Sequence, residues 1–523
     1  MDDAGCGEPA ELERTFSTKI PYFRLILPVR LVYTHSGCFS GARGVRRAFG
    51  YFMVLQTSVF LTLVCTACSA PPLRIPRDRP NTFEYALSTE AAWPTLDWYR
   101  AFSSTELDRL IRLALDDNLD LAAAEARVRQ ADARARAAGG AILPQVDLSP
   151  SATRFSGRSN GVVAHETDWS ALLSASYEVD FWGKNRANRN ALGYAAVASE
   201  ADRGTVALTI EAGVANGYFQ LLSIRERARL ARANLDSARE ILAAIQARFD
   251  AGAAGPAELA AQRAAVATAE LTLPGLAQQE IETRAALALL VGHAPEGFVI
   301  EAQVLDGLSE PVVAPGLPVE LLTRRPDILS AEANLRSAHA DVGAARAALF
   351  PSLTLTASGG VQNPAVQAAV LTLEGTGPAL TLGASLTQTI FDAGRRRAAR
   401  DEAQAHETEL IATYRAAILS ALVDVETALA AIQHLNAQRS AQAENVAQSE
   451  RAWEGARLRY RAGSGDFLSV LDAQRTLNSA REQMSQYRLA RLQAIVSLCK
   501  ALGGGWEPAS RFEHVTGEHP PIP

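Results

Sequence analysis

The sequence predicts a mainly α-helical protein with a smaller β-stranded portion, built from two tandem copies of one pattern. Two stretches of 67 residues without proline, residues 184–250 and 395–461, predict very long helices. Alternating polar and apolar residues precede each of them, over about residues 144–182 and 351–391. We therefore expect helix, strand, strand, very long helix and return helix in each copy.

Length and composition favour close helix packing. A chain of 523 residues is long enough for more than one structural unit. It is rich in alanine, and only 7% of its residues are aromatic, which suits long helices packed through small side chains. The net charge of -6 gives no electrostatic basis for binding nucleic acid, so we expect no nucleic-acid partner.

A targeting segment is predicted over residues 1–67. A basic flank at Arg46 and Arg47 precedes an apolar run and small residues that end at Cys68. The run is shorter than the roughly 20 residues of a spanning helix, so it predicts a secretory signal. Its final cysteine indicates a lipoprotein signal, in which Cys68 carries a diacylglycerol on sulfur and an acyl chain on nitrogen. Cys65 stands where leucine is usual, so a non-lipidated signal with incidental cysteines remains open.

The basic flank lies about 45 residues into the chain, deeper than in ordinary signals. A translation start near Val45 would restore the usual position, and residues 1–44 would then be an extension ahead of the signal. After the signal, the proline-rich residues 68–104 are predicted to form a lipid-anchored tether.

No catalytic or metal-binding pattern is found in the sequence. Beyond the signal only Cys68 and Cys499 remain, and Cys499 is expected to be a small packed hydrophobe near a helix end. The eight histidines are scattered, without the spacing of a metal site. Because a nucleophile elbow and a phosphate-binding loop are also missing, we expect neither an enzyme nor a cofactor other than the lipid.

The two copies are expected to occupy most of the mature chain. We place repeat 1 at residues 105–307 and repeat 2 at residues 327–507, with a linker over residues 308–326 and a tail over residues 508–523. These bounds follow the positions at which the pattern recurs.

Each copy begins with a shorter helix. In repeat 1, Thr105 is expected to cap a helix that runs to Ala138 and ends at the following glycine pair. In repeat 2, residues 316–325 are expected to form a loop, and Pro326 suits the first turn of the next helix.

The strand patterns predict a sheet between two environments, because apolar residues share one face and serines and carboxylates the other. A half-buried sheet of a soluble protein is one interpretation. Four strands, however, cannot close a barrel, for which about eight are needed. Each expected strand, including residues 380–390, is close to the roughly 9 to 11 residues that cross a bilayer. We therefore favour a barrel shared by several subunits, with basic turns at residues 180–186 and 391–397 at the membrane boundary.

Helical hairpins are predicted over about residues 184–291 and 395–503, each broken by a glycine that permits a left-handed helix end, Gly252 and Gly463. The two glycines are 211 positions apart. The second long helix also has a heptad seam, in which β-branched residues alternate with tyrosine, alanine or leucine, at Ile411, Tyr414, Ile418, Ala421, Val425, Ala428, Ile432 and Leu435.

From about Trp98 to Trp506 the sequence resembles the outer membrane factor family, the TolC-like outer-membrane efflux proteins, and especially their lipoprotein branch. The characteristic motifs are Thr323-Arg324-Arg325-Pro326-Asp327-Ile328, Leu349-Phe350-Pro351-Ser352-Leu353, Phe391-Asp392-Ala393-Gly394 and Leu471-Asp472-Ala473-Gln474-Arg475. The resemblance implies a homotrimer, in which twelve strands form one outer-membrane barrel and twelve helices continue it as a periplasmic tunnel.

The resemblance also implies a gate. The positions that match the constriction of the family are Leu468 and Asp472, one helical turn apart. A trimer would contain a ring of three leucines and a ring of three carboxylates, which would favour cations. A second acidic ring of some relatives would fall at Ser469, which is uncharged. The residues alone leave open that Asp472 is a solvated side chain paired with Arg475.

The turns at Gly252 and Gly463 match the loops that relatives present to a periplasmic adaptor, although they could be simple helix reversals. We expect a passive outer-membrane exit duct that is lipid-anchored and extends into the periplasm. It would serve a tripartite efflux pump for drugs or other small molecules, with an adaptor and an inner-membrane transporter of the resistance-nodulation-division type. The alternatives are an exit duct for type I protein secretion and a periplasmic coiled-coil scaffold lipoprotein without a pore.

Overall fold

The fold is seen in a computed structural model, which describes residues 83–84, 93–159, 162–302, 305, 307–313, 320–362, 379–504 and 506–507. All of them belong to one compact unit, Cys68–Pro523. The predicted signal, Cys68 and the tail over residues 508–523 lie outside the described residues, as do parts of the tether and of the linker.

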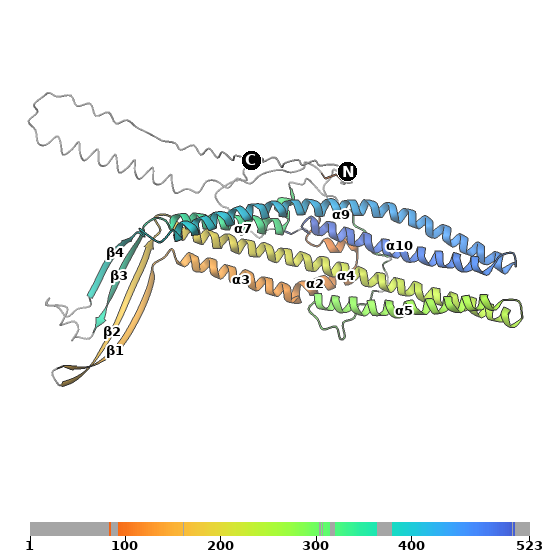
Figure 1. The fold of residues 1–523 in the computed structure, drawn as a ribbon, viewed down its shortest axis with the longest axis horizontal. Helices are drawn as coiled ribbons and strands as arrows, with labels where there is room; N and C mark the ends of the chain where they lie inside the picture. Colours follow the sequence, from red (N-terminus) through yellow and green to blue (C-terminus); the bar gives the residue numbers. More distant parts are fainter. Residues whose placement is uncertain are drawn as a thin grey trace, which may run out of the picture. The chain divides into compact units, whose positions relative to one another are not determined.

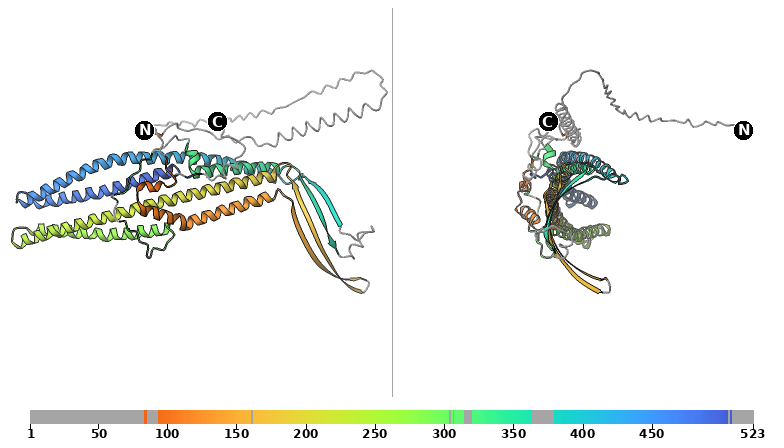
Figure 2. Two further views of the ribbon diagram at one scale, coloured as in Figure 1. Left: turned by 180° about the vertical axis from the view of Figure 1, so that it is seen from behind. Right: turned by 90° about the vertical axis from the view of Figure 1, so that its left-hand side faces the viewer.

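Two copies of the same element order make up the described chain (Figure 1). The elements are η1 (Trp98–Phe102), α2 (Thr105–Asp117), α3 (Leu119–Gly140), β1 (Gln145–Ser159), β2 (Val162–Val179), α4 (Lys184–Asp250), α5 (Pro256–Leu290), α6 (Leu321–Arg324), α7 (Pro326–Ala347), β3 (Ser352–Gln362), β4 (Ala379–Thr387), α9 (Arg395–Arg461) and α10 (Phe467–Ala501). The strands leave one end of the helices, and the two hairpin turns lie at the other end (Figures 1 and 2).

The long helices have the bounds that the sequence predicts. Both α4 and α9 contain 67 residues, and both return helices, α5 and α10, contain 35. The heptad seam of α9 is largely buried, with Tyr414, Ile418, Ala421 and Val425 facing neighbouring helices. Within the unit, α4 packs against α5, α7 and α3, while α9 packs against α10 and α7.

The first helix differs from its prediction. It is divided at Asn118, whose side chain accepts hydrogen bonds from the N–H groups of Asp120 and Leu121 and so caps α3. The amide of Asn118 also donates to the carbonyl of Leu290 at 2.8 Å, which anchors the break to α5. The N-cap of α2 is Ser104 rather than Thr105, because the Ser104 side chain accepts from the N–H of Leu107.

The prediction of a loop over residues 316–325, before the second copy, is also partly wrong. Residues 321–324 form the short helix α6, whereas Pro326 begins α7 as predicted. Arg325 lies between these helices and is only 8% exposed. Its guanidinium donates to both carboxylate oxygens of Asp327, to Asp424 and to the carbonyl of Ala501, so one side chain connects the start of repeat 2 to α9 and α10.

Both return helices are followed by a glycine that no other residue could replace without a clash. A side chain on Gly503 would place its Cβ 2.3 Å from the carbonyl oxygen of Arg324, and one on Gly292 would lie 2.2 Å from that of Asp117. Both glycines also have positive φ. Each return helix therefore ends against the last turn of the short helix that opens its own copy.

The four strands form one antiparallel sheet in the order β1-β2-β3-β4. Two strands exceed the expected length, since β1 has 15 residues and β2 has 18, while β3 has 11 and β4 has 9. The last strand ends at Thr387, three residues before the predicted Ile390, as the chain turns toward the start of α9.

The strand register gathers the apolar side chains on one face. The pairs Leu148↔Leu173, Tyr177↔Leu355 and Leu353↔Leu386 all lie on it. Many of these side chains are exposed, including Val146, Leu148, Trp169, Leu173, Leu355, Leu380, Leu382 and Leu386. The opposite face carries mainly serine and threonine, such as Ser174, Ser358 and Thr381, which are also cross-strand neighbours. The sheet therefore has one apolar and one polar face, as the alternation predicts.

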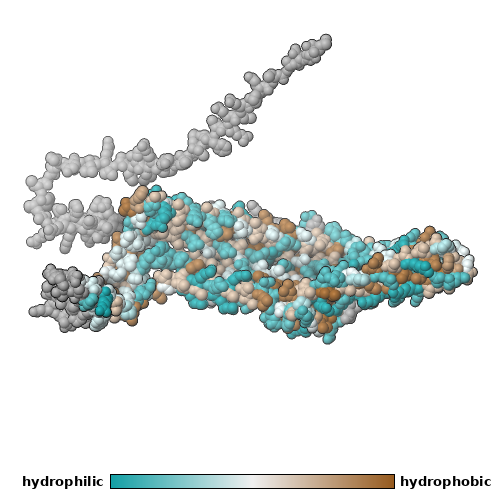
Figure 3. Space-filling view, turned by 60° about the horizontal axis from the view of Figure 1, so that its bottom comes forward, coloured by the Kyte–Doolittle hydropathy of each residue, from teal (hydrophilic) through white to brown (hydrophobic). Residues whose placement is uncertain are grey.

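The largest buried cluster lies in the helical part, near the middle of the long helices. It joins η1 and α2 to α4, α9 and α10 through residues such as Phe102, Leu110, Phe219 and Val496. Cys499 is buried in this cluster, which confirms its predicted packing role, and burial raises the pKa of its thiol to about 12. On the face drawn in Figure 3, apolar patches alternate with polar ones along the helices to the hairpin end.

Candidate gate at the helical tips

The two hairpin turns, defined here as tip 1 around Gly252 and tip 2 around Gly463, close their long helices in the same way. In tip 1 the N–H of Gly252 donates to the carbonyl of Phe249, and the N–H of Ala253 donates to the carbonyl of Arg248. In tip 2 the N–H groups of Gly463 and Ser464 donate to the carbonyls of Tyr460 and Arg459, respectively. Both glycines have φ near +74°, which identifies two Schellman motifs.

The return helices begin differently. Gly255 precedes Pro256 at the start of α5, and its helix end has no side-chain cap. By contrast, Asp466 caps α10, accepting hydrogen bonds of 2.8 Å from the N–H and from the hydroxyl of Ser469. These bonds hold the pKa of Asp466 below its ordinary value. Tip 2 is thus fixed by a charged cap that tip 1 does not have.

The predicted gate residues share the free face of α10. Leu468 is 65% exposed, and the side chain of Asp472 is 77% exposed. The opposite face of the same turn holds Phe467, Val470 and Leu471, all nearly fully buried. The first turns of α10 are therefore amphipathic, and the structure leaves an apolar and a charged side chain together on the surface that faces away from the protomer.

The matching positions of repeat 1 are Ala257 and Ala261, at the same distance from Gly252. These methyl groups offer neither the volume of Leu468 nor the charge of Asp472. At these positions, tip 2 therefore has a bulky apolar side chain and a carboxylate, whereas tip 1 has two methyl groups.

Asp472 has a partner within its own helix. Arg475 Nη1 lies 3.8 Å from Asp472 Oδ1, in the i,i+3 relation that places both side chains on one face. Both are largely exposed, so solvent screening makes this ion pair weak. The pair nevertheless places a positive charge beside the carboxylate of Asp472. This is the ion pair that the sequence alone left open as an alternative.

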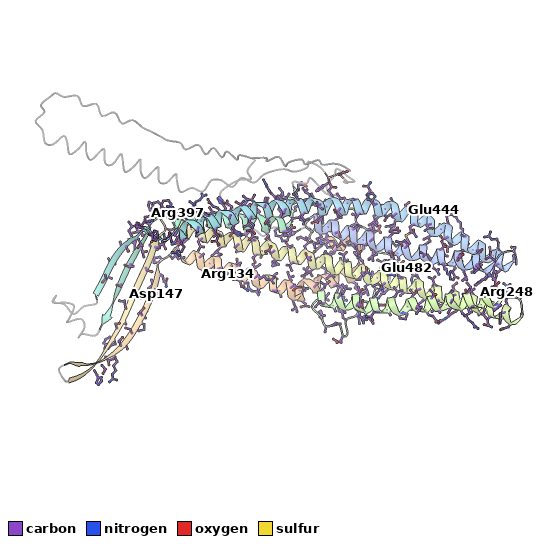
Figure 4. All side chains as sticks on the ribbon, viewed as in Figure 1. Arg134, Asp147, Arg248, Arg397, Glu444 and Glu482 are labelled. Atoms are coloured by element: carbon purple, nitrogen blue, oxygen red, sulfur yellow. The ribbon has the colours of Figure 1, made fainter. Side chains whose placement is uncertain are left out.

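A contact between Tyr460 and Glu258 connects the two tips. The Tyr460 hydroxyl donates to Glu258 Oε2 at 3.4 Å, so the end of α9 reaches the first turn of α5. Burial, followed by the nearby charge of Glu258, raises the pKa of Tyr460. Arg248, in the last turn of α4, lies over the same ring with its Cζ 4.7 Å from the centroid. Tyr460 therefore touches both helices of the neighbouring hairpin (Figure 4 labels Arg248).

An apolar cluster lies behind this polar contact. Ile245 of α4, Leu259 of α5, and Phe467 and Leu471 of α10 pack together and are almost fully buried. The Tyr460 ring also packs against Phe467, with centroids 5.6 Å apart. The tips are thus held side by side by an apolar core with a polar contact at its end.

The sequence patterns did not point to Tyr460, Glu258 and Arg248 as functional candidates. One signal was present, because Tyr460 and Phe249 occupy equivalent positions just before the two glycines, yet only Tyr460 has a hydroxyl. Its partner could not be inferred, because Glu258 is 202 residues away and is brought close only by the packing of the two hairpins.

A groove of about 440 Å³ lies between the hairpins. Its walls include Thr268 and Leu276 of α5, and Gln474 and Arg475 of α10. Arg227 of α4 and Glu482 of α10 form an ion pair of 2.7 Å beside it (Figure 4 labels Glu482). The groove therefore begins next to the gate face and follows the line along which the hairpins would separate.

No group of side chains in the described ranges has the arrangement of a metal site. The predicted lipid attachment point, Cys68, lies outside the described residues. Gly252 and Gly463 lie at the hairpin turns, where the sequence places them. The site consists of two helical tips, one face with Leu468 and Asp472, and the contacts that hold the hairpins together.

Comparisons with known proteins agree with this architecture. A family model described as "Outer membrane efflux protein" matches residues 110–293 and 317–504. The chain is 43% identical over 457 residues to the pyoverdine export outer membrane protein OpmQ of Pseudomonas aeruginosa, covering 85% of this chain and 95% of OpmQ. It is also 29% identical over 460 residues to the probable outer membrane lipoprotein SilC of Salmonella typhimurium, covering 86% and 98% of the two chains.

Among solved structures, the outer-membrane channel OprN matches with a TM-score of 0.77 and 28% sequence identity. The match covers 84% of this chain and all of the OprN chain.

Proposed function

Because the chain belongs to the outer membrane efflux protein family, and is thus an outer-membrane protein, we propose that three copies form one passive exit duct. Twelve strands would close a barrel in the outer membrane, and twelve helices would continue it as a tunnel into the periplasm. The duct would perform no chemistry and would carry its cargo past the outer membrane.

The observation that carries this proposal is the exposed apolar face of the sheet. Its side chains, such as Leu148, Leu173 and Leu382, are more than half exposed in the protomer. Burying such area is worth about 25 cal/mol per Å², so leaving it in water would be costly. Lipid can cover it once the sheet has no free edges, and four strands are too few for closure.

The long helices also have an unpaired apolar surface. α9 contains an 18-residue window that is apolar enough to span a membrane by length and composition, yet only 28% of it is buried. Leu419 and Val423 are about 60% exposed on this helix. Since a helix of 67 residues is far longer than a bilayer is thick, we propose that neighbouring protomers cover this surface.

We propose that tip 2 closes the duct. In a trimer, Leu468 and Asp472 of three chains would converge as an apolar ring and a charged ring at the narrow end. The contact between Tyr460 and Glu258 would hold the closed arrangement. Opening would require an adaptor that binds the open state more tightly than the closed one. The surfaces around Gly252 and Gly463 are the proposed adaptor contacts.

The inner-membrane partner would supply the energy, and we propose a transporter of the resistance-nodulation-division type. The cargo would be drugs or other small molecules. Because OpmQ is named for pyoverdine export, pyoverdine is the first cargo to test. The groove along the tips and the rings at Leu468 and Asp472 would control opening, while the choice of cargo would rest mainly with the transporter.

Two alternatives predict different results. An exit duct for type I protein secretion would serve a protein cargo, and the relatives named for toluene efflux and cation efflux argue against it. A coiled-coil scaffold without a pore would need no sheet with an exposed apolar face, so that sheet argues against it.

A lipid anchor at Cys68 is part of the proposal, supported by the signal pattern and by the lipoprotein name of SilC. In cells fed an alkyne fatty acid, the wild-type protein should be labelled, while Cys68→Ala should not. Cys499→Ala is the matched control, because Cys499 is buried in the helical core. Labelling that persists in Cys68→Ala would place the lipid elsewhere.

The duct function is tested by deleting the gene and measuring release of fluorescent small molecules and pyoverdine from loaded cells. Deletion should slow release, and the intact gene should restore it. Normal release of every small molecule, together with loss of a secreted protein, would favour type I secretion. Normal release of both would favour the scaffold.

A further inference from the structure

The two turns that join sheet to helix differ in their charge balance. Residues 178–186, from the end of β2 to the start of α4, contain two acidic and two basic residues. The matching residues 389–397, which lead into the start of α9, contain one acid and three consecutive arginines. The two copies of the repeat therefore place unequal charge at corresponding places in the fold.

In the first turn, both cations have partners within the chain. Lys184 Nζ lies 2.6 Å from Glu178 Oε1, and Arg186 Nε lies 3.1 Å from Asp180 Oδ2. Asp180 also accepts hydrogen bonds from the N–H groups of Asn185 and Arg186. The charged side chains of this turn therefore pair with one another and stabilise the turn itself.

In the second turn, only the middle arginine has a side-chain partner among the described residues. Arg396 donates to the carbonyl of Ala348 at 2.7 Å, and its backbone N–H donates to Asp392. Arg395 and Arg397 are exposed, and neither guanidinium makes a hydrogen bond or an ion pair with the described residues. The first turn of α9 also contains no acidic residue. These two positive charges thus have no partner among the residues that the structure describes.

These arginines follow directly on the exposed apolar surface. Ile390 and Phe391, just after β4, are 90% and 86% exposed. Arg397 lies where the helices meet the sheet (Figure 4). The chain therefore passes from apolar strand residues to an exposed aromatic residue and then to the exposed arginines. A bilayer changes in the same order, from hydrocarbon to headgroups.

We propose that Arg395 and Arg397 bind the phosphate groups of anionic phospholipids in the periplasmic leaflet of the outer membrane. A guanidinium offers paired N–H donors that fit two phosphate oxygens, and an anionic membrane surface attracts such side chains. The inference rests on the proposed function in one respect, since it takes the apolar face of the sheet as the membrane wall.

The test is native mass spectrometry of the full-length protein, purified in detergent and titrated with phosphatidylglycerol or phosphatidylcholine of the same acyl chains. The wild-type protein should retain more phosphatidylglycerol. The double variant Arg395→Gln/Arg397→Gln should bind it about thirtyfold more weakly, because two cations near an anionic surface are lost. Retention of phosphatidylcholine should not change.

Arg459→Gln/Arg461→Gln is the matched control. These arginines lie in the last turn of the same helix, with the same spacing, at the tip end. The control removes the same charge and should bind phosphatidylglycerol like the wild type. A loss as large as that of the first double variant would mean a general charge effect and would overturn the proposal.

Other outcomes are equally decisive. Equal retention of both lipids by the wild type, or unchanged binding by the Arg395→Gln/Arg397→Gln variant, would refute the arginine site while leaving the duct intact. Binding of glycerol phosphate as tightly as phosphatidylglycerol would instead indicate a site for soluble phosphate and would also refute it. If the wild type retained neither lipid, the arginine site would also be refuted, while the duct would remain intact.

Discussion

The hydroxyl of Tyr460, at the end of α9, donates a hydrogen bond of 3.4 Å to Oε2 of Glu258, in the first turn of α5. The two residues belong to different copies of the repeat, so the bond joins the two hairpins close to their tips. Any movement that separates the tips must break it.

Replacing Tyr460 by phenylalanine should therefore favour the open duct. The ring and its contacts with Phe467 and Arg248 are retained, and only the hydroxyl is lost. One hydrogen bond contributes about 1 kcal/mol, which is roughly a fivefold change in the open-to-closed ratio. Single-channel open probability is the measurement, and Glu258→Gln should add little in the double variant. Phe249→Leu, at the corresponding position of tip 1, is the control. An unchanged open probability for Tyr460→Phe would contradict this role.

Shortening the gate side chains should widen the closed end. Leu468→Ala with Asp472→Ala removes the apolar ring and the carboxylate ring together, so conductance and cell permeability to large antibiotics should rise. The control, Ala257→Ser with Ala261→Ser, changes the matching positions of repeat 1 and should have little effect. Equal permeability of the gate variant and the wild type would exclude these residues from the constriction.

Removing the partner of Asp472 should change ion selectivity. With Arg475 beside it, each carboxylate of the ring is partly compensated, so the cation preference expected for the ring should be weak in the wild type. Arg475→Gln leaves three uncompensated carboxylates and should shift the reversal potential in a salt gradient toward cations. Lys500→Gln removes the same charge far from tip 2 and serves as the control. A reversal potential that does not move would show that Arg475 does not face the pore.

Stability should depend on pH through Glu211 of α4. Its carboxylate accepts a 2.9 Å hydrogen bond from the indole N–H of Trp98. Burial raises the pKa of Glu211 to about 7; the Trp98 bond opposes this shift, and the charge of Asp97 adds to it. Because the folded pKa exceeds the unfolded one, the folded state binds the extra proton, and the free energy of unfolding falls as pH rises from about 5 to 8.

The size of that fall follows from the pKa shift. A rise from 4.5 to about 7 corresponds to about 3 kcal/mol per chain. Glu211→Gln should abolish this component, which denaturant unfolding at pH 5, 6, 7 and 8 can measure. Asp472→Asn, at an exposed carboxylate, is the control. If the wild type and Glu211→Gln showed the same pH dependence, the assigned pKa would be wrong.

The hairpins were predictable because their signals are local. No proline interrupts residues 184–250 or 395–461, and a glycine with positive φ ends each long helix. The alternation of the strands likewise predicted the two faces of the sheet. These features depend on nearest neighbours along the chain, so the sequence alone could locate them.

Other features depend on contacts between distant segments. Asn118 breaks the first helix with the help of Leu290, which belongs to another element. The contact between Tyr460 and Glu258 arises only when the two hairpins pack together. The exposed face with Leu468 agrees with the predicted gate surface, but its role as a gate stays a prediction, because one protomer contains only one third of the proposed ring.

The most direct measurement of the central claim is current through planar bilayers that contain the purified full-length protein, with insertion confirmed independently. A trimeric duct closed by tip 2 should give rare, brief openings in the wild type, and frequent, larger openings in Leu468→Ala/Asp472→Ala. Bilayers that stay silent for both proteins, despite confirmed insertion, would contradict the duct and favour a scaffold without a pore.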